Sequence, residues 1–465
     1  MKVLTNYFAG YRKQGGIKEL LLLAYPMIVS TASDGIMTFT DRIFLARLGP
    51  EYMNAAMGGG VTLLTLTLFF IGLTGYSTAL VAQYYGAGDK KNASATTFQA
   101  GIIAIVAWLV IVLCIPLLFW FFGAMDVPAS QINLQKEYTQ ILAWGSVTGL
   151  LRHTLSCYFT GIGKTRIVMM ATLAALVVNV ILDYLLITGA FGISPMGVEG
   201  AAYATVSGAF TAFIILLFAY LNKKNRVEFF VMQSFRYSKI VMKKLLYYGS
   251  PAGFEMLLNL FAFSIVINML HSEGEVEATA STIMFNWDLM SFIPLLGIEI
   301  AVTSLVGRYM GAGRPQVAHR AAVSGVKIGL FYSLFVLILF VFFPYWLVML
   351  FQPQEFDSVF NAAIPLSINM IQIASLYVLA EAVLVAYIGA LRGAGDTYFT
   401  MFASVSLHWL MVPVLFLSLR VWDFGILTAW SIIVVLFLCF CSVLYFRFKS
   451  GKWKKIRVIN PPLNS

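Results

Sequence analysis

Long apolar runs make up most of this chain and leave few folds open to it. About twelve of them follow one another along the 465 residues, each near or above the roughly 20 residues that a helix needs to cross a bilayer. They lie near 18–45, 53–83, 96–124, 138–160, 166–190, 199–221, 243–270, 278–307, 321–351, 361–390, 397–419 and 424–446. Backbone hydrogen bonds must be satisfied internally within a membrane, so each run is expected to be helical. The sequence predicts an all-α integral membrane protein with twelve transmembrane helices.

Basic residues lie unevenly among the loops that separate these runs. If the loops alternate between two sides, one side holds 25 of the 31 Lys and Arg residues. They include four residues before the first run (Lys2, Arg12, Lys13 and Lys18) and seven between Lys223 and Lys244. The opposite side holds only Arg42, Arg47, Lys136 and Arg420. The positive-inside rule then places both termini in the cytoplasm and the protein in the cell (inner, cytoplasmic) membrane as a multi-pass protein. This placement also explains the basic excess without a nucleic-acid partner.

The chain contains an internal repeat. The phrase "LVAQYYGAG" at 80–88 returns as "LVGRYMGAG" at 305–313, an offset of 225 residues. Pro26 and Pro251 share this offset, as do Gly72 and Gly297. Further on, "GIGKT" at 161–165 is echoed by "GAGDT" at 393–397, with the offset grown to 232. Ordered matches at a nearly fixed offset indicate a duplicated half.

Six crossings return the chain to its starting side, so the two halves have the same orientation. We therefore predict two six-helix lobes related by a pseudo-two-fold axis along the membrane normal, as in parallel-repeat transporters. The N-terminal lobe spans 1–221 (helices 1–6) and a cytoplasmic linker spans 222–244. The C-terminal lobe spans 245–465 (helices 7–12) and ends in a basic cytoplasmic tail.

The glycines of the repeated phrases are expected to end helices. The sequence "GAG" after a helix supplies positions free to adopt positive φ in a tight turn. "GIGKT" resembles a phosphate-binding loop, but the required spacing needs a glycine where this chain has Tyr158. Nucleotide binding is therefore not expected.

Acidic residues inside the apolar runs are the first candidates for function, because an ionisable group in a membrane span is costly. There are seven: Asp34, Asp41, Asp183, Glu255, Asp288, Glu299 and Glu381. Several share a helix face with a second polar residue: Asp34 with Asp41 two turns apart, and Asn179 with Asp183, Glu255 with Asn259, and Tyr377 with Glu381 one turn apart. Carboxylates backed by amide and hydroxyl oxygens can capture Na⁺, or they can hold a proton.

A structural role is the alternative for some of these acids. Asp288 and Glu299 can simply accept hydrogen bonds, and Glu299 lies near the cytoplasmic end of its run, where a carboxylate can reach water. Arg152 and Lys327 are the basic residues well inside the runs, so salt bridges cannot neutralise all seven acids.

Several longer segments are distinctive: "DRIFLARLG", "LVAQYYGAGD", "NVILDYLLI" followed by "GVEGAAYAT", "FIPLLGIEIAVTSLVGRYMGAGR" and "ALRGAGDT". Through these segments the chain resembles the multidrug and toxic compound extrusion (MATE) transporters over essentially its whole length. The resemblance implies a secondary antiporter that exports cationic, amphipathic compounds against an inward flow of Na⁺ or H⁺. In one branch of this family, an Asp of helix 1, an Asn and an Asp of helix 5, and a Thr of helix 6 form a cation site. By motif position these residues are Asp41, Asn179, Asp183 and Thr205.

The C-terminal lobe departs from the family pattern. In the NorM branch, helix 7 carries an acid eight residues after its proline; this chain has Asn259 there and Glu255 one turn earlier. Glu381 precedes the "LRG" motif as that branch requires, and Asp34 lies 225 residues before Asn259. The candidates for a second ion or substrate site are Asp34, Glu255, Asn259, Asp288, Tyr377 and Glu381.

We therefore expect an antiporter working by alternating access of its two lobes, with Na⁺ or H⁺ as the coupling ion and no cofactor or further metal. Its partners would be small amphipathic cations and membrane lipid, and we expect it to function as a monomer. The nearest alternative is a flippase of the same superfamily, for a lipid-linked sugar or another lipid, although a cavity for a lipid-linked sugar should favour basic residues. A channel is a third alternative, but asymmetrically placed buried acids suit a site that closes around its ligand better than a continuously open pore. A membrane enzyme is disfavoured because His153, His271, His319 and His408 have no catalytic or ligand spacing.

Overall fold

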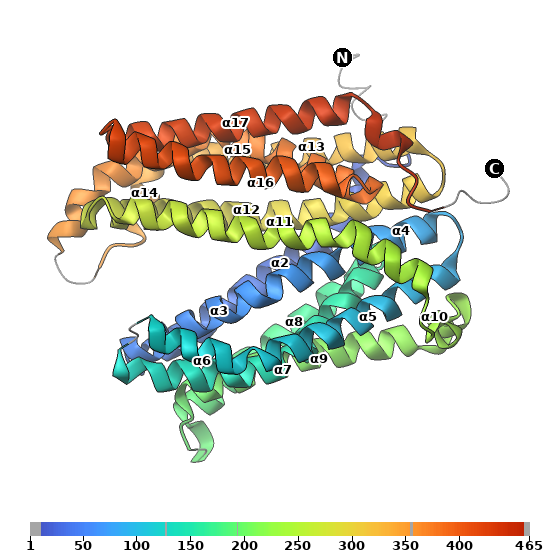
Figure 1. Ribbon diagram of the computed structural model, residues 1–465, viewed down its shortest axis with the longest axis horizontal. Coiled ribbons are helices and arrows are strands. Elements are labelled where there is room, and N and C mark those ends of the chain that lie inside the picture. Colours follow the sequence, from blue (N-terminus) through green and yellow to red (C-terminus); the bar gives the residue numbers. More distant parts are fainter. Residues whose placement is uncertain (1–10, 126–127, 193, 354–356, 460–465) are drawn as a thin grey trace. The chain divides into compact units, whose positions relative to one another are not determined.

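A computed structural model describes residues 11–125, 128–192, 194–353 and 357–459 (Figure 1). Lys2, one of the predicted cytoplasmic cations, lies outside these residues. The described part is helical and contains no strand, which confirms the predicted fold class. In chain order its elements are α2 (Ile17–Ala46), α3 (Pro50–Gly75), α4 (Ser77–Gly86), α5 (Lys90–Leu113), α6 (Ile115–Ala124), α7 (Ala129–Gly161), α8 (Thr165–Leu182), η1 (Asp183–Ile187), η2 (Ala190–Gly192), α9 (Gly197–Leu221), α10 (Lys223–Glu228), η3 (Val231–Ser234), α11 (Lys239–His271), α12 (Glu275–Gly311), α13 (Pro315–Phe342), α14 (Pro344–Met349), α15 (Ser358–Ala394), α16 (Thr397–Phe416), η4 (Leu417–Val421), α17 (Ile426–Lys449) and η5 (Lys452–Lys455).

Each predicted crossing corresponds to a helical stretch. Within the described residues, eleven stretches are long and apolar enough to span a membrane. The twelfth is α7, whose 33 residues are long enough but include Lys136, Glu137 and Arg152. Some crossings are interrupted near one end. For example, the stretch that contains α5 and α6 breaks at Cys114, just before a proline at the start of α6.

The order of elements repeats between the two halves of the chain. Both α2 and α11 contain the proline predicted from the repeat, Pro26 and Pro251. In each half, a long apolar helix ends in a five-residue π-helical turn, at Asp183–Ile187 and at Leu417–Val421. Such wide turns are rare and often mark functional sites. Their recurrence at matched positions agrees with a duplicated half.

The repeated glycine phrases end helices as predicted. Gly88, Gly313, Gly163 and Gly395 all have positive φ, between 70° and 95°. The two copies of the first phrase also contact each other. A methyl group on Gly86 would overlap the carbonyl oxygen of Arg308, and one on Gly311 would overlap that of Gln83. Gln83 and Arg308 are themselves 225 residues apart, so the contact is reciprocal.

By internal contacts the described chain forms two compact units. The first, which we call the N-terminal unit, comprises Tyr25–Gly253, Gly307–Gly313 and 458–459. The C-terminal unit comprises 11–24, Phe254–Val306 and Arg314–Arg457. The predicted lobe limits at 221 and 245 remain a prediction.

Candidate functional site

Three of the predicted coupling residues meet inside the N-terminal unit. Asp41 lies on α2 and is 6% exposed. Asn179 of α8 donates from Nδ2 to Asp41 Oδ1 at 3.0 Å, and Thr205 of α9 donates from Oγ1 to Asp41 Oδ2 at 2.8 Å. Ser30 on α2 also bonds Thr172 on α8 at 2.8 Å, which fixes the packing of these two helices. Both Asp41 oxygens therefore accept hydrogen bonds from neutral donors.

Asp183, the fourth predicted residue, lies beside Asp41 and is fully buried. It begins the π-helical turn η1, one helical turn after Asn179. No donor among the described residues reaches either of its carboxylate oxygens, and Oδ1 of Asn179 is likewise without a hydrogen bond. Two adjacent carboxylates can share a hydrogen bond only if one holds a proton. The arrangement therefore provides oxygen ligands for a small cation or a place for a proton.

Apolar side chains lie close to these residues. Leu45, Tyr138, Ile187, Val198 and Ala201 pack together, drawing on α2, α7, η1 and α9. Leu45 follows Asp41 by one helical turn, and Ile187 follows Asp183 by four residues. The Tyr138 hydroxyl interacts electrostatically with both carboxylates. Low polarity around the carboxylates strengthens their attraction for any cation that reaches them.

Asp41 and Thr205 also line a cavity of about 400 Å³ in the same unit. Residues of α2, α3, α7 and α9 form its walls, which are largely apolar and include Leu64, Ile71 and Leu142. Polar side chains at its surface are Thr38, Arg42, Thr67, Ser146, Arg152 and His153. A cavity of this size and composition is typical of small-molecule sites.

Asp34 does not belong to the same unit as the other five candidates for a second ion or substrate site. It lies in the N-terminal unit, where its Oδ1 pairs with Arg152 Nη1 at 3.0 Å, while the other five candidates belong to the C-terminal unit. Its side chain is 40% exposed. His153, next to Arg152, contacts the carbonyl of Ile71 at 3.2 Å and Cys157 Sγ at 3.6 Å.

Asp288, Tyr377 and Glu381 come together in the C-terminal unit. The Tyr377 hydroxyl donates a short hydrogen bond to Asp288 Oδ1. Glu381 is 4% exposed, interacts electrostatically with Asp288, and its Oε2 has no hydrogen-bond partner within the described chain. The ring of Tyr377 packs against Trp430 and Phe437. The predicted one-turn spacing therefore does place Tyr377 and Glu381 at one site, with Asp288 supplied by α12.

Glu255 and Asn259 have different partners. Arg392 is forked between two carboxylates, with Nη2 at 3.1 Å from Glu255 Oε2 and Nη1 at 2.5 Å from Glu299 Oε1. Asn259 donates to Ser404 Oγ at 2.8 Å. The expectation that Glu299 reaches water is wrong, since its side chain is only 12% exposed and is held by Arg392.

Arg392 is a site residue that the sequence pattern does not identify. The apolar run ends near residue 390, which would leave Arg392 in a loop, but α15 continues to Ala394 and ends at Gly395, whose φ is +95°. The charge balance is the sequence signal that could have pointed to Arg392, because buried carboxylates require nearby cations. Among the described residues, Asp34, Glu255 and Glu299 have a Lys or Arg within 4.0 Å, whereas Asp41, Asp183, Asp288 and Glu381 do not.

Comparisons with known proteins agree with this architecture. The sequence profile of the MatE family matches residues 26–185 and 251–417, which together make up more than half of the chain. The chain belongs to the MATE family of transporters. It is 28% identical over 409 residues to the multidrug resistance protein PmpM of Pseudomonas aeruginosa, covering 86% of this chain and 83% of that protein. It is 27% identical over 449 residues to the probable multidrug resistance protein NorM of Thermotoga maritima, covering 95% and 94%.

Solved structures share the fold. A structure of MATE in the bent conformation superposes with a TM-score of 0.85 at 20% identity, covering 97% of this chain and 98% of that one. A MOP superfamily transporter from Pyrococcus furiosus, described as having a binding pocket of reverse polarity that suggests a different function, also gives 0.85 at 20% identity, with 96% and 98% covered.

Proposed function

We propose that this protein is a secondary antiporter that exports amphipathic organic cations in exchange for inward Na⁺ or H⁺. The observation that carries the proposal is the carboxylate pair Asp41 and Asp183, buried without a basic partner among the described residues and adjoining a cavity. Its sequence relatives PmpM and NorM are described as multidrug resistance proteins, which supports the substrate class.

Coupling follows from the chemistry of the pair. Binding a cation or proton would remove the repulsion between Asp41 and Asp183 and draw α2 and η1 together. An ion can drive a conformational change only if it binds the two forms with different affinity. A ligand site that needs two separate elements to approach has this property, because any movement of α2 changes the number of oxygens available.

The same cavity wall can hold the exported compound. Asp41 and Thr205 face both the coupling cluster and the 400 Å³ cavity, so the organic cation and the coupling ion can compete for one carboxylate. We also propose that both termini are cytoplasmic, which rests on the uneven distribution of basic loop residues.

The test is transport by the full chain in liposomes. Uptake of a fluorescent organic cation would be followed under an imposed pH gradient and then a Na⁺ gradient, with both signs of each. We expect one ion to drive movement, and Asp41→Asn and Asp183→Asn each to lower the initial rate by about tenfold or more.

A matched control is Glu228→Gln, which removes a carboxylate that lies outside the membrane spans. It should transport like the wild type. If both aspartate variants retained ion-driven transport, the coupling assignment would fail. If neither gradient moved the dye with correctly folded protein, the flippase alternative would replace the antiporter.

A further inference from the structure

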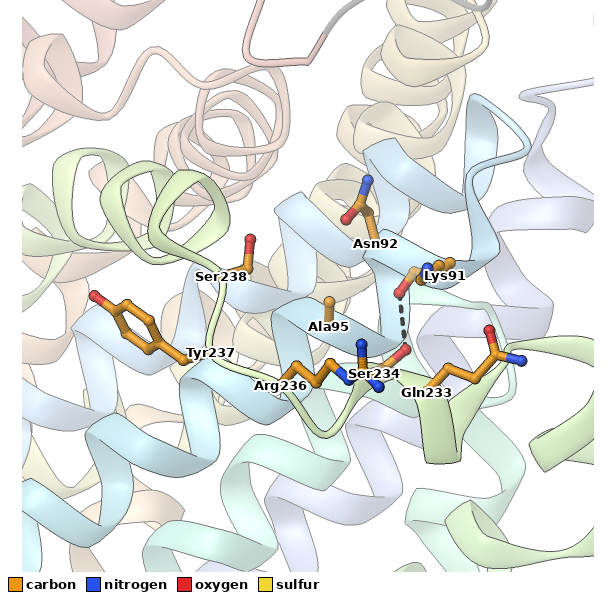
Figure 2. A pocket seen from close by; sticks show the side chains of 8 residues that line it. All are labelled: Lys91, Asn92, Ala95, Gln233, Ser234, Arg236, Tyr237 and Ser238. Carbon is orange, nitrogen blue, oxygen red and sulfur yellow. Dashed lines mark hydrogen bonds between the residues drawn. The ribbon is translucent and has the colours of Figure 1, made fainter.

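The segment that follows α10 forms a hollow with the start of α5, and this hollow belongs to none of the features described above. We call it the linker hollow; it measures about 310 Å³. Its lining residues are Lys91, Asn92 and Ala95 of α5 and Gln233, Ser234, Arg236, Tyr237 and Ser238 of the linker (Figure 2).

Buried polar contacts hold the linker in this shape. Ser234, which is 3% exposed, donates from Oγ to the Lys91 carbonyl at 3.2 Å (Figure 2). Gln99 on α5 is fully buried and binds the linker twice. Its Nε2 donates to the Arg236 carbonyl at 2.9 Å, and its Oε1 accepts from the Ser238 amide at 3.3 Å. The hollow is therefore formed in advance, so a ligand would not have to order it.

Two basic side chains at the hollow are not neutralised by any described residue. Within the described part of the chain, neither the Lys91 ammonium nor the Arg236 guanidinium has a hydrogen-bond or ion-pair partner, and no carboxylate lines the hollow. Asp89, just before it, already accepts two hydrogen bonds from Asn92. Uncompensated positive charge in a concavity favours an anionic ligand.

Neighbouring cations, by contrast, have partners. Lys90 pairs with Glu228 at 3.0 Å, and this ammonium holds the pKa of the Glu228 carboxyl below its usual value. Glu228 therefore stays ionised and bound to Lys90 at neutral pH. Lys164 lies 5.6 Å from the Phe229 ring centre, and Lys244 lies 5.5 Å from that of Tyr84.

Tyr237 lines the hollow, and three other large apolar side chains lie close to its linker residues in the sequence. Met232, Phe235, Tyr237 and Ile240 are 58%, 40%, 65% and 71% exposed. Figure 2 shows Tyr237 pointing away from Arg236 and Gln233. Met232, Phe235 and Tyr237 lie just before α11, a membrane-spanning candidate, and Ile240 lies in its first turn. Exposed aromatic and aliphatic groups at the end of a membrane span are suited to the bilayer interface. A soluble anion would gain nothing from these groups, whereas a lipid has acyl chains to cover them.

We propose that the linker hollow binds the phosphate-bearing headgroup of an anionic phospholipid, with Lys91 and Arg236 on the phosphate and the exposed apolar side chains against the acyl chains. Guanidinium and ammonium donors are the groups that bind phosphate oxygens in proteins. The inference goes beyond transport and does not depend on it.

The test is lipid binding to the purified, delipidated full chain, with the lipid-bound fraction measured by native mass spectrometry. Phosphatidylglycerol should bind more tightly than phosphatidylcholine. The variant Lys91→Gln/Arg236→Gln should bind phosphatidylglycerol about 10- to 30-fold more weakly. Lys223→Gln/Lys224→Gln is the matched control: it removes the same charge from α10, outside the hollow, and should bind like the wild type.

Further variants guard against misfolding. Each single substitution should weaken binding by about fivefold, and Lys91→Arg/Arg236→Lys should retain it.

An equal loss in the control pair would indicate general attraction to a basic surface and overturn the site. Equal binding of the two lipids would do the same, as would loss in the charge-retaining variant. If inorganic phosphate alone bound as tightly as the lipid and displaced it, the ligand would be a free phosphate and the lipid assignment would fall. No ion gradient is used, so the result is independent of the antiport test.

Discussion

The intramembrane acids divide into two groups according to whether a basic side chain neutralises them. Asp34 and the pair Glu255 and Glu299 are bound by arginines, as expected of acids with a structural role. Asp41 instead accepts from Thr205 and Asn179, and Asp183 accepts from no described group. A carboxylate that has no fixed cation can bind a mobile one, which is why we assign coupling to this pair.

Thr205→Val tests the hydroxyl that holds Asp41. The substitution keeps the shape of the side chain but removes the donor at 2.8 Å, so Asp41 is less well positioned for an ion. We expect the concentration of driving ion needed for half-maximal transport to change by about five- to tenfold. Thr211→Val is the control, because the Thr211 hydroxyl bonds the Ser207 carbonyl on its own helix. A Thr205 variant indistinguishable from this control would argue against the coupling geometry.

Arg392 gives an asymmetric prediction. Arg392→Gln leaves Glu255 and Glu299 buried and facing each other, which should destabilise the protein by about 3–5 kcal/mol. Glu299→Gln leaves a one-to-one pair between Arg392 and Glu255, so its effect on stability should be much smaller. Thermal unfolding in detergent measures both, and equal effects of the two variants would contradict this account.

At the scale of elements, the duplicated phrase explains how helices approach closely. Gly86 ends α4 and Gly311 ends α12, and each lies against a carbonyl in the other copy. Glycine is needed because a Cβ at either position would overlap backbone. The π-helical turn of the first half also positions a proposed coupling residue. This turn, η1, begins with Asp183, which lies beside Asp41.

Gly86→Ala and Gly311→Ala should each destabilise the protein by about 1–3 kcal/mol, because the added methyl group forces the backbones apart. Gly101→Ala on α5 is the matched control: apart from its chain neighbours and the backbone of its own helix, no atom lies within 4 Å of the position that a Cβ would take there. Alanine should therefore be neutral or slightly stabilising at this position. Melting temperatures in detergent compare the three. Unchanged stability in both phrase variants would refute the close contact.

At the scale of the whole molecule, the proposed topology can be tested directly. Cysteines would be introduced one at a time, Gln352→Cys between α14 and α15 and Ser450→Cys after α17, with the four natural cysteines replaced. The positive-inside rule puts the Ser450 side in the cytoplasm. A membrane-impermeant maleimide should label intact cells only at position 352 and should label position 450 after permeabilisation. The reverse pattern would invert the topology.

The helical class, the crossings, the duplication and the identity of the candidate acids could all be predicted from the sequence. These features depend on local properties: run length against bilayer thickness, one-turn spacing on a helix, and glycines that end helices. Asn179 and Asp183 could be paired in this way because they lie on one helical stretch, and so could Tyr377 and Glu381.

Which acids lack a fixed basic partner could be seen only in the packed helices. Whether Arg152 reaches Asp34, or Arg392 reaches both Glu255 and Glu299, depends on helices that are far apart in sequence. The placement of Thr205 on Asp41 likewise depends on packing between α9 and α2. Charge neutralisation in a membrane interior acts over a few ångströms between different helices, and periodicity along one helix carries no information about it.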